Sequence, residues 1–126
     1  MYSYSYDKET CLLKVDFFNT MTLDDFKNYL DEFRTLSFLP KSLKILYDLS
    51  DCELSLKPPE VKVISEISEQ LNADFDRIYS AYIVNKPLET ALTIIFSNAV
   101  KNPNFRRRVF STEEAARSWL KQYENV

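Results

Sequence analysis

The chain has 126 residues, a formal net charge of −3 at pH 7, and neither glycine nor histidine. Without glycine it cannot form a glycine-rich phosphate-binding loop, because the backbone of such a loop approaches the phosphate where a Cβ atom would clash. Without histidine it has no Ser-His or Cys-His nucleophile pair and no histidine metal ligand, so any catalysis would depend on carboxylates, lysine, tyrosine or cysteine.

The rest of the composition is that of a folded globular protein. Hydrophobic residues make up 45% of the chain and aromatic residues 14%, and the length predicts a single domain over residues 1–126. The acidic balance argues against a nucleic-acid partner. Cys11 and Cys52 are too few for a metal site, no apolar stretch approaches the roughly 20 residues of a membrane span, and the first residues lack a signal-peptide pattern. We therefore expect a cytoplasmic protein with no metal, no other cofactor and no membrane span.

Two strands and a helix are predicted first. Tyrosine alternates with serine from Tyr2 to Tyr6, a period of two that indicates a strand, and residues 11–18 form a second strand after a polar turn. Thr22 is placed to cap a helix whose first turn carries two carboxylates. The apolar face of that helix consists of Leu23, Phe26, Leu30 and Phe33.

Strands and helices then alternate. Residues 43–49 predict a short apolar strand that ends at Ser50-Asp51, and Pro58-Pro59 begins a helix, since proline fits the first helical position. The buried stripe of this second helix consists of Ile64, Ile67, Leu71 and Phe75. A further strand is predicted over residues 78–84.

The last third of the chain continues the alternation. A third helix is predicted over residues 87–101 and a fifth strand over residues 105–110. Ser111 and Glu114 have the spacing of a capping box before a last helix. The order β-β-α-β-α-β-α-β-α predicts an α/β fold with a mixed, mostly parallel five-stranded sheet, four helices and right-handed crossovers.

Two motifs, taken with this order, resemble a known family. The first is Lys-Ile-Leu-Tyr-Asp-Leu-Ser at residues 44–50, and the second is Arg-Val-Phe-Ser-Thr-Glu-Glu-Ala-Ala at residues 108–116, followed by Trp119-Leu120. They are similar to the corresponding segments of SpoIIAA-like proteins, a branch of the STAS-type anti-sigma-factor-antagonist fold. The resemblance implies a bacterial module that acts by binding and not by catalysis. The similarity of this branch to STAS and CRAL-TRIO lipid-transfer folds is the basis of that implication.

One departure from the STAS pattern concerns regulation. Classical STAS antagonists carry Asp-Ser-Ser-Gly-Leu-Gly after the third strand, and a kinase phosphorylates the second serine. Here residues 51–59 are Asp-Cys-Glu-Leu-Ser-Leu-Lys-Pro-Pro, and Ser55 lies near the expected place among neighbours that do not match. Phosphorylation is therefore not carried over to Ser55.

The carboxyl ends of parallel strands, with the helix starts that follow them, are where α/β sheets bind ligands. The polar residues expected there, as binding residues for a partner or ligand, are Asp48, Ser50, Asp51, Ser55, Asn85 and Lys86. Asp48 with Lys86 is the only plausible acid–base couple. We favour the simpler interpretation, in which Asp48 accepts backbone amides at a turn and Lys86 is solvated, and we predict no catalytic residue.

Three further features are candidates for interaction surfaces. The third predicted helix is apolar over a broad arc, and Leu92, Ile95 and Phe96 indicate either an apolar ligand cavity or a dimer interface beside it. The run of arginines at residues 106–108 is interpreted as protection of a sheet edge. The tyrosines of the first strand either pack as cross-strand pairs or form a partner or dimer surface.

The leading interpretation is thus a non-enzymatic regulatory or interaction module that binds a protein partner, with a homodimer as one form of that partner. Its expected binding surface is the loop after the third strand with the adjoining helix. The alternative is a small protein that binds an apolar, lipid-like ligand beside the third helix.

Overall fold

The computed structural model describes residues 1–123, and within them the predicted order of strands and helices is confirmed. The nine elements are β1 (Tyr2–Asp7), β2 (Leu12–Thr22), α1 (Leu23–Arg34), β3 (Ser42–Ser55), α2 (Pro58–Asn72), β4 (Arg77–Ile83), α3 (Pro87–Asn98), β5 (Phe105–Phe110) and α4 (Glu113–Lys121).

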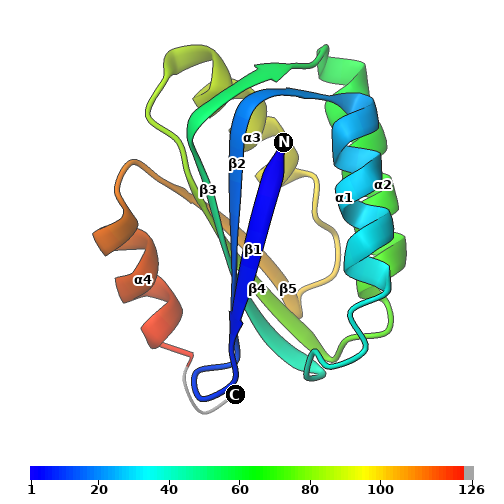
Figure 1. The fold of residues 1–126 in the computed structure, drawn as a ribbon, viewed down its shortest axis with the longest axis vertical. Coiled ribbons are helices and arrows are strands. Elements are labelled where there is room, and N and C mark those ends of the chain that lie inside the picture. The colour runs from blue at the N-terminus through cyan, green and yellow to red at the C-terminus, as the bar shows by residue number, and fades with distance from the viewer. Residues whose placement is uncertain (124–126) are drawn as a thin grey trace.

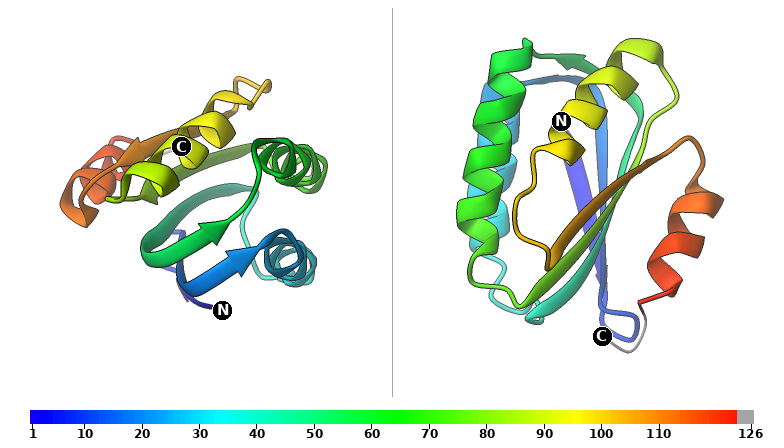
Figure 2. Two further views of the ribbon diagram at one scale, coloured as in Figure 1. Left: turned by 90° about the horizontal axis from the view of Figure 1, so that it is seen from above. Right: turned by 180° about the vertical axis from the view of Figure 1, so that it is seen from behind.

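The sheet has the order β1-β2-β3-β4-β5. β1 is antiparallel to β2, and β2 to β5 run parallel to one another. Each parallel strand is added on the same side of the one before it, so right-handed crossovers place α1, α2 and α3 on one face. α4 follows the last strand and returns along the other face (Figures 1 and 2).

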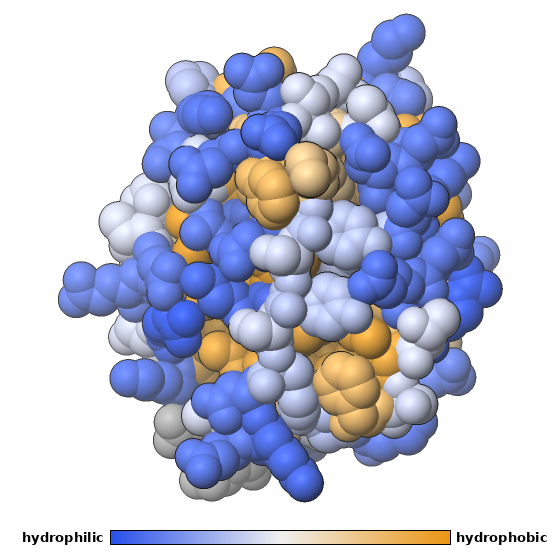
Figure 3. All heavy atoms as spheres, viewed as in Figure 1, coloured by the Kyte–Doolittle hydropathy of each residue, from blue (hydrophilic) through white to orange (hydrophobic). Residues whose placement is uncertain are grey.

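Two hydrophobic cores follow from this layering. The larger core lies between the sheet and the three crossover helices, and its fully buried residues include Leu13, Ile45 and Ile78. The smaller core lies between the sheet and α4, where Trp119 packs with Leu46 and Ala81. Figure 3 shows the side of the molecule that carries β1, where hydrophobic residues form separate patches within a hydrophilic surface.

The third strand is longer than predicted, because a β-bulge replaces the expected end. Asp16 of β2 pairs with Asp48, but Phe18 pairs with Asp51, so β3 contains one more residue than β2 across this step. The Asp48 carboxylate accepts hydrogen bonds from the Ser50 backbone N–H at 2.9 Å and from the Ser50 hydroxyl at 2.6 Å. This local bond supplies a partner for the amide at the bulge, and the strand continues to Ser55.

The predicted helix caps are right for α1 and wrong for α4. The Thr22 hydroxyl accepts a hydrogen bond from the Asp25 N–H at 3.3 Å, and the Asp25 carboxylate accepts one from the Thr22 N–H at 2.8 Å. At α4 the cap is Thr112, whose hydroxyl accepts from the Ala115 N–H at 3.2 Å. The predicted box of Ser111 with Glu114 is therefore off by one residue.

Candidate functional site

A groove lies at the carboxyl ends of β4 and β5, where the connections that follow these two parallel strands turn to opposite faces of the sheet. The connection after β4 runs to α3 on one face of the sheet, and the connection after β5 runs to α4 on the other (Figure 1). α/β proteins bind ligands at such points, because the diverging loops leave a crevice outside the strand ends. The groove has a volume of about 800 Å³ and runs between α3 and β5. We call it the α3–β5 groove.

The lining of the α3–β5 groove is basic and partly apolar. Its cations are Lys86, Arg107 and Arg108, and no carboxylate lines it, although the chain as a whole is acidic. Ile94 and Phe110 supply apolar surface. Within residues 1–123, the ion pairs are made by other basic residues, so none of these cations is neutralised by a carboxylate. The groove therefore presents uncompensated positive charge beside hydrophobic side chains.

The arginine run divides between the two faces of β5, because successive side chains of a strand point to opposite faces. Arg107 points toward the crossover helices, where its Nη1 donates to the Ser65 hydroxyl and to the Phe96 carbonyl, both at 3.0 Å. Its guanidinium also lies 4.1 Å from the centre of the Phe96 ring, and Nη2 is buried without a hydrogen-bond partner. Arg108 lies on the opposite face, 5.5 Å from the centre of the Phe110 ring. The lining of the groove thus includes residues from both faces of β5.

Two of the predicted binding residues, Asn85 and Lys86, line this groove. Lys86 is half-buried, and its Nζ donates to the Cys52 carbonyl at 3.5 Å. The buried Glu89 in the first turn of α3 accepts a hydrogen bond from the Leu54 N–H at 3.1 Å. Both contacts provide hydrogen-bond partners for backbone groups in the part of β3 that extends past the end of β4.

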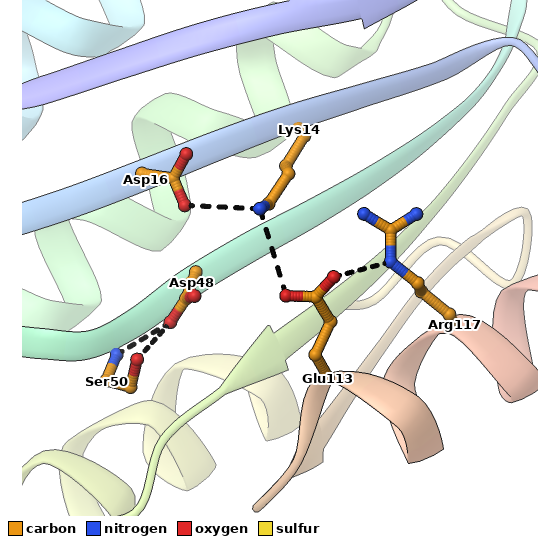
Figure 4. A network of polar contacts seen from close by, with 6 residues as sticks. All are labelled: Lys14, Asp16, Asp48, Ser50, Glu113 and Arg117. Carbon is orange, nitrogen blue, oxygen red and sulfur yellow. Dashed lines mark hydrogen bonds and ion pairs between the residues drawn. The ribbon is translucent and has the colours of Figure 1, made fainter.

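Asp48 and Ser50 lie apart from the groove lining, and Figure 4 shows them as a separate bonded pair near a network of charged side chains on the α4 face. There Lys14 lies 3.8 Å from both the Asp16 and the Glu113 carboxylates, and Glu113 also pairs with Arg117 at 2.7 Å. Asp48 accepts hydrogen bonds from the backbone and hydroxyl of Ser50, as predicted, but it does so at a bulge within β3 and not at a turn. The prediction that Lys86 is solvated is wrong, because this residue is half-buried and bonded to the Cys52 carbonyl. Because Asp48 and Lys86 bond to different groups, the acid–base couple is not formed.

Asp51 and Ser55 are exposed residues of β3, not of a loop. They pair with Phe18 and Thr22 of β2 through the continued parallel ladder. The prediction that these residues form a loop after the third strand is therefore wrong, because the bulge keeps this segment in the sheet.

A small apolar cavity lies between the sheet and α1, α2 and α3. Its volume is about 60 Å³, and its lining includes Leu92 and Phe96, two of the three residues predicted there. Ile95 is the exception, because its side chain is 45% exposed on the outer face of α3. The Tyr29 and Tyr47 hydroxyls lie 2.9 Å apart at this cavity. Burial raises the pKa of both phenols well above the ordinary range, so they are neutral.

The cysteines and acidic residues do not assemble a reactive centre in residues 1–123. No three side chains of Cys, Asp or Glu gather there in a group that could hold a metal ion. Cys52 is fully buried, and burial raises the pKa of its thiol to about 11, so it is protonated at neutral pH. None of the helices in this part of the chain has the length and apolar character needed to cross a membrane.

The order of elements and the sheet topology define a small α/β module with a SpoIIAA/STAS-like fold. A family model described as SpoIIAA-like matches residues 12–121, and the chain belongs to the SpoIIAA-like family. The crystal structure of an uncharacterised protein from Shewanella loihica PV-4 with a SpoIIAA-like fold is similar, with a TM-score of 0.57 and 16% sequence identity. That match covers 95% of this chain and 92% of the other, and at this identity it shows the fold alone. No curated protein matches the sequence.

Proposed function

We propose that the protein is a non-enzymatic interaction module and that the α3–β5 groove binds an acidic, partly apolar segment of a protein partner. The observation that carries the proposal is the lining of the groove, in which Lys86, Arg107 and Arg108 occur without any carboxylate. Complementary charge steers a partner and fixes its orientation, while buried apolar contacts supply most of the affinity.

The shape of the groove favours a polypeptide segment over other anions. Its volume is about 800 Å³, its lining residues run along α3 from Pro87 to Asn98 and along β5 from Arg107 to Phe110, and the apolar part of this lining offers surface that inorganic anions do not use. Nucleic acid generally requires a broad basic face, which a chain of net charge −3 does not favour. An extended segment with alternating acidic and apolar side chains matches both properties.

The non-enzymatic part of the proposal is supported by Asp48 and Lys86, the only acid–base candidates of the sequence, which are engaged separately. Cys11 and Cys52 are both free thiols in the structure. Free thiols persist in a reducing compartment, so we include a cytoplasmic location in the proposal.

The test is selection of binding peptides from a random display library, followed by affinity measurements with synthetic peptides. We expect the selected sequences to be enriched in Asp and Glu next to apolar residues, and their affinity to fall as salt rises. Arg108→Glu should weaken binding at least about tenfold, because one charge contact changes sign. Arg108 is chosen because it is exposed, whereas Arg107 also holds Ser65 and Phe96 in place.

Lys62→Glu is the matched control, since Lys62 is an exposed cation of α2 that does not line the groove. It makes the same change of net charge and should leave the affinity unaltered. Equal weakening by both variants would mean that only the overall charge matters. Selected peptides without acidic residues would contradict the proposal directly.

The second candidate function, binding of an apolar ligand, is favoured by the cavity below α3. Its lining is almost wholly apolar and includes Leu92 and Phe96. Its volume of about 60 Å³ is far below the ~300–1,000 Å³ of typical ligand pockets, so a lipid-like tail would fit only if the helices moved apart. Native mass spectrometry with a denatured control tests this function. An added mass that disappears on denaturation would support it, and a bare chain would leave it without support.

A further inference from the structure

The two edges of the sheet are protected to very different degrees. β5 forms one edge and exposes Arg106 and Arg108, which oppose pairing with a like strand. β1 forms the other edge, and its sequence Tyr-Ser-Tyr-Ser-Tyr-Asp carries no charge before Asp7. β1 also lacks proline and a bulge, which are the other common means of blocking an edge. β1 is therefore the open edge of this sheet, and it lies in front in Figure 1.

The direction of the backbone groups along β1 follows from its pairing with β2. The Phe18 N–H donates to the Met1 carbonyl at 3.0 Å, and the register places Tyr2 opposite Phe17 and Ser3 opposite Asp16. In an antiparallel ladder the residues that bond to the neighbouring strand alternate with residues whose N–H and C=O point away from it. Ser3 and Ser5 therefore bond to β2, and Tyr2, Tyr4 and Tyr6 direct their N–H and C=O groups to the free edge.

We propose that a second copy of this chain pairs with β1 in antiparallel orientation, with Tyr4 opposite the second copy's Tyr4. This register places Tyr2 opposite the second copy's Tyr6, and Ser3 opposite its Ser5. The two-fold axis passes beside Tyr4, perpendicular to the sheet. Rotation about it places the outward N–H and C=O groups of the tyrosines in one copy opposite the outward C=O and N–H groups of the tyrosines in the other. A two-fold interface requires such a self-complementary surface. The two sheets become one continuous sheet.

The side chains along this edge suit an interface. Tyr2, Tyr4 and Tyr6 are half-buried on the α1 side, where the Tyr2 hydroxyl donates to Glu32 at 2.7 Å. The Tyr6 ring lies 5.4 Å from the ring of Phe38, which is 56% exposed. Because the register brings the second copy's Tyr2 opposite Tyr6, the pairing also covers apolar surface next to Phe38. Tyrosine and phenylalanine are enriched at interfaces between proteins.

A second copy on the β5 edge is disfavoured by the same reasoning. An antiparallel pair of β5 strands would bring arginines of the two copies close together, and like charges directly opposite one another destabilise a strand pair. The β1 edge is also separate from the α3–β5 groove, so this inference does not depend on the proposed function. Since a single edge strand of six residues buries less than the ~1,200–2,000 Å² of a stable interface, we expect a reversible dimer that dissociates on dilution.

The test uses Ser3 and Ser5, which are exposed and face each other across the proposed pair. In Ser3→Lys/Ser5→Lys the new lysines oppose lysines of the second copy, and in Ser3→Glu/Ser5→Glu glutamates oppose glutamates. Within one chain, Ser3 is opposite Asp16 and Ser5 is opposite Lys14 on β2. Each double variant therefore places one new charge opposite an unlike charge and one opposite a like charge. Because these two effects offset each other in both variants, the two should fold equally well. A one-to-one mixture opposes lysine to glutamate at every contact.

Sedimentation velocity over a range of concentrations gives the mass of the wild-type chain and of the variants. We expect a dimer for the wild type, at least about tenfold weaker association for each variant alone, and recovery of a dimer in the mixture. A wild-type chain that stays at 14.9 kDa throughout would overturn the proposal. So would variants that dimerise as well as the wild type, because the contact would then lie elsewhere.

Hydrogen exchange measured by NMR tests the same contact without any substitution. The Tyr4 amide should exchange more slowly as the protein concentration rises, since the second copy covers it. The Ser5 amide, which bonds to β2 in either state, should show little change. Equal exchange of the Tyr4 amide at low and high concentration, in a sample that does dimerise, would reject the β1 edge as the interface.

Discussion

Two side chains, one from α3 and one from the residue before it, bond to backbone groups of β3 at the place where β3 extends beyond its neighbour β4. β3 runs to Ser55, but β4 ends at Ile83, so the far end of β3 has no strand on that side. The Glu89 carboxylate accepts a hydrogen bond from the Leu54 N–H there, and Lys86 donates to the Cys52 carbonyl. The first turn of α3 therefore takes the place of the missing strand, which explains why a glutamate is buried to 7% exposure.

Glu89→Ala should lower the free energy of unfolding by about 1–3 kcal/mol, because the Leu54 N–H would remain buried without an acceptor. Glu89→Gln keeps a side-chain oxygen in place and should cost clearly less. Urea unfolding of the two variants and the wild type measures the difference. If both substitutions cost the same, the acceptor role of Glu89 is wrong.

At the scale of elements, α4 depends on one large side chain. It is the only helix of the described residues on its face of the sheet, and Trp119, 7% exposed, packs edge-on to Tyr79 and beside Phe110 in the smaller core. Trp119→Ala should reduce the free energy of unfolding by roughly 3 kcal/mol or more, through lost burial and the cavity left behind. Ser118→Ala, an exposed change on the same helix, is the control and should be nearly neutral. A loss below about 1 kcal/mol for Trp119→Ala would mean that α4 contributes little to the fold.

The order of elements could be predicted from the sequence, but the end of β3 could not. Periodicity and proline positions are local signals, and they predicted every strand and helix in the correct order. Ser50-Asp51 looks like the start of a loop because serine and aspartate favour turns. Its actual role depends on the Asp48 side chain and on β2, which continues beside β3 through the bulge. Pairing with a distant strand decided the outcome, and no local pattern encodes it.

The candidate site was predictable only in part, for similar reasons. Asn85 and Lys86 follow a strand directly, so the general rule for parallel sheets placed them at the groove they line. The sequence left open whether Ile95 lies at a cavity or at a dimer interface, because α3 is apolar over so much of its circumference that the inner face cannot be identified. The structure excludes the cavity for this residue. The sequence indicated edge protection for Arg108 and did not place it in a binding site. A run of arginines in an acidic chain was the available signal, but the absence of carboxylates around it is visible only in three dimensions.

For the molecule as a whole, the absence of histidine shapes the response to pH. No side chain has an unperturbed pKa between pH 5 and 8, so the folded and unfolded chains gain or lose few protons in that range. Buried neutral groups dominate on the alkaline side. Burial raises the pKa of Cys52 from 9.0 to about 11 and that of Tyr2 from 10.0 to about 12, and it raises those of Tyr29 and Tyr47 further.

These shifts predict a stability that is flat from about pH 6 to 8.5 and falls at higher pH. A raised pKa means that the folded state keeps a proton which the unfolded state loses, so the stabilisation is complete below the unfolded pKa and disappears as the pH passes through the folded value. The loss should begin near pH 9, where Cys52 ionises in the unfolded chain, and steepen above pH 10 as the tyrosines follow. Each fully buried group contributes up to about 1.4 kcal/mol per pH unit, and the partly exposed Tyr2 contributes less because solvent screens it.

Urea unfolding at a series of pH values measures this profile, and Cys52→Ala separates its two stages. The variant should be less stable than the wild type at neutral pH, because Cys52 is fully buried, but its stability should stay level until about pH 10. The steeper loss above pH 10 should remain, since it belongs to the tyrosines. A decline that already starts between pH 6 and 8 would require a titrating group other than these, and an unchanged onset in Cys52→Ala would remove the buried thiol as the cause of the first stage.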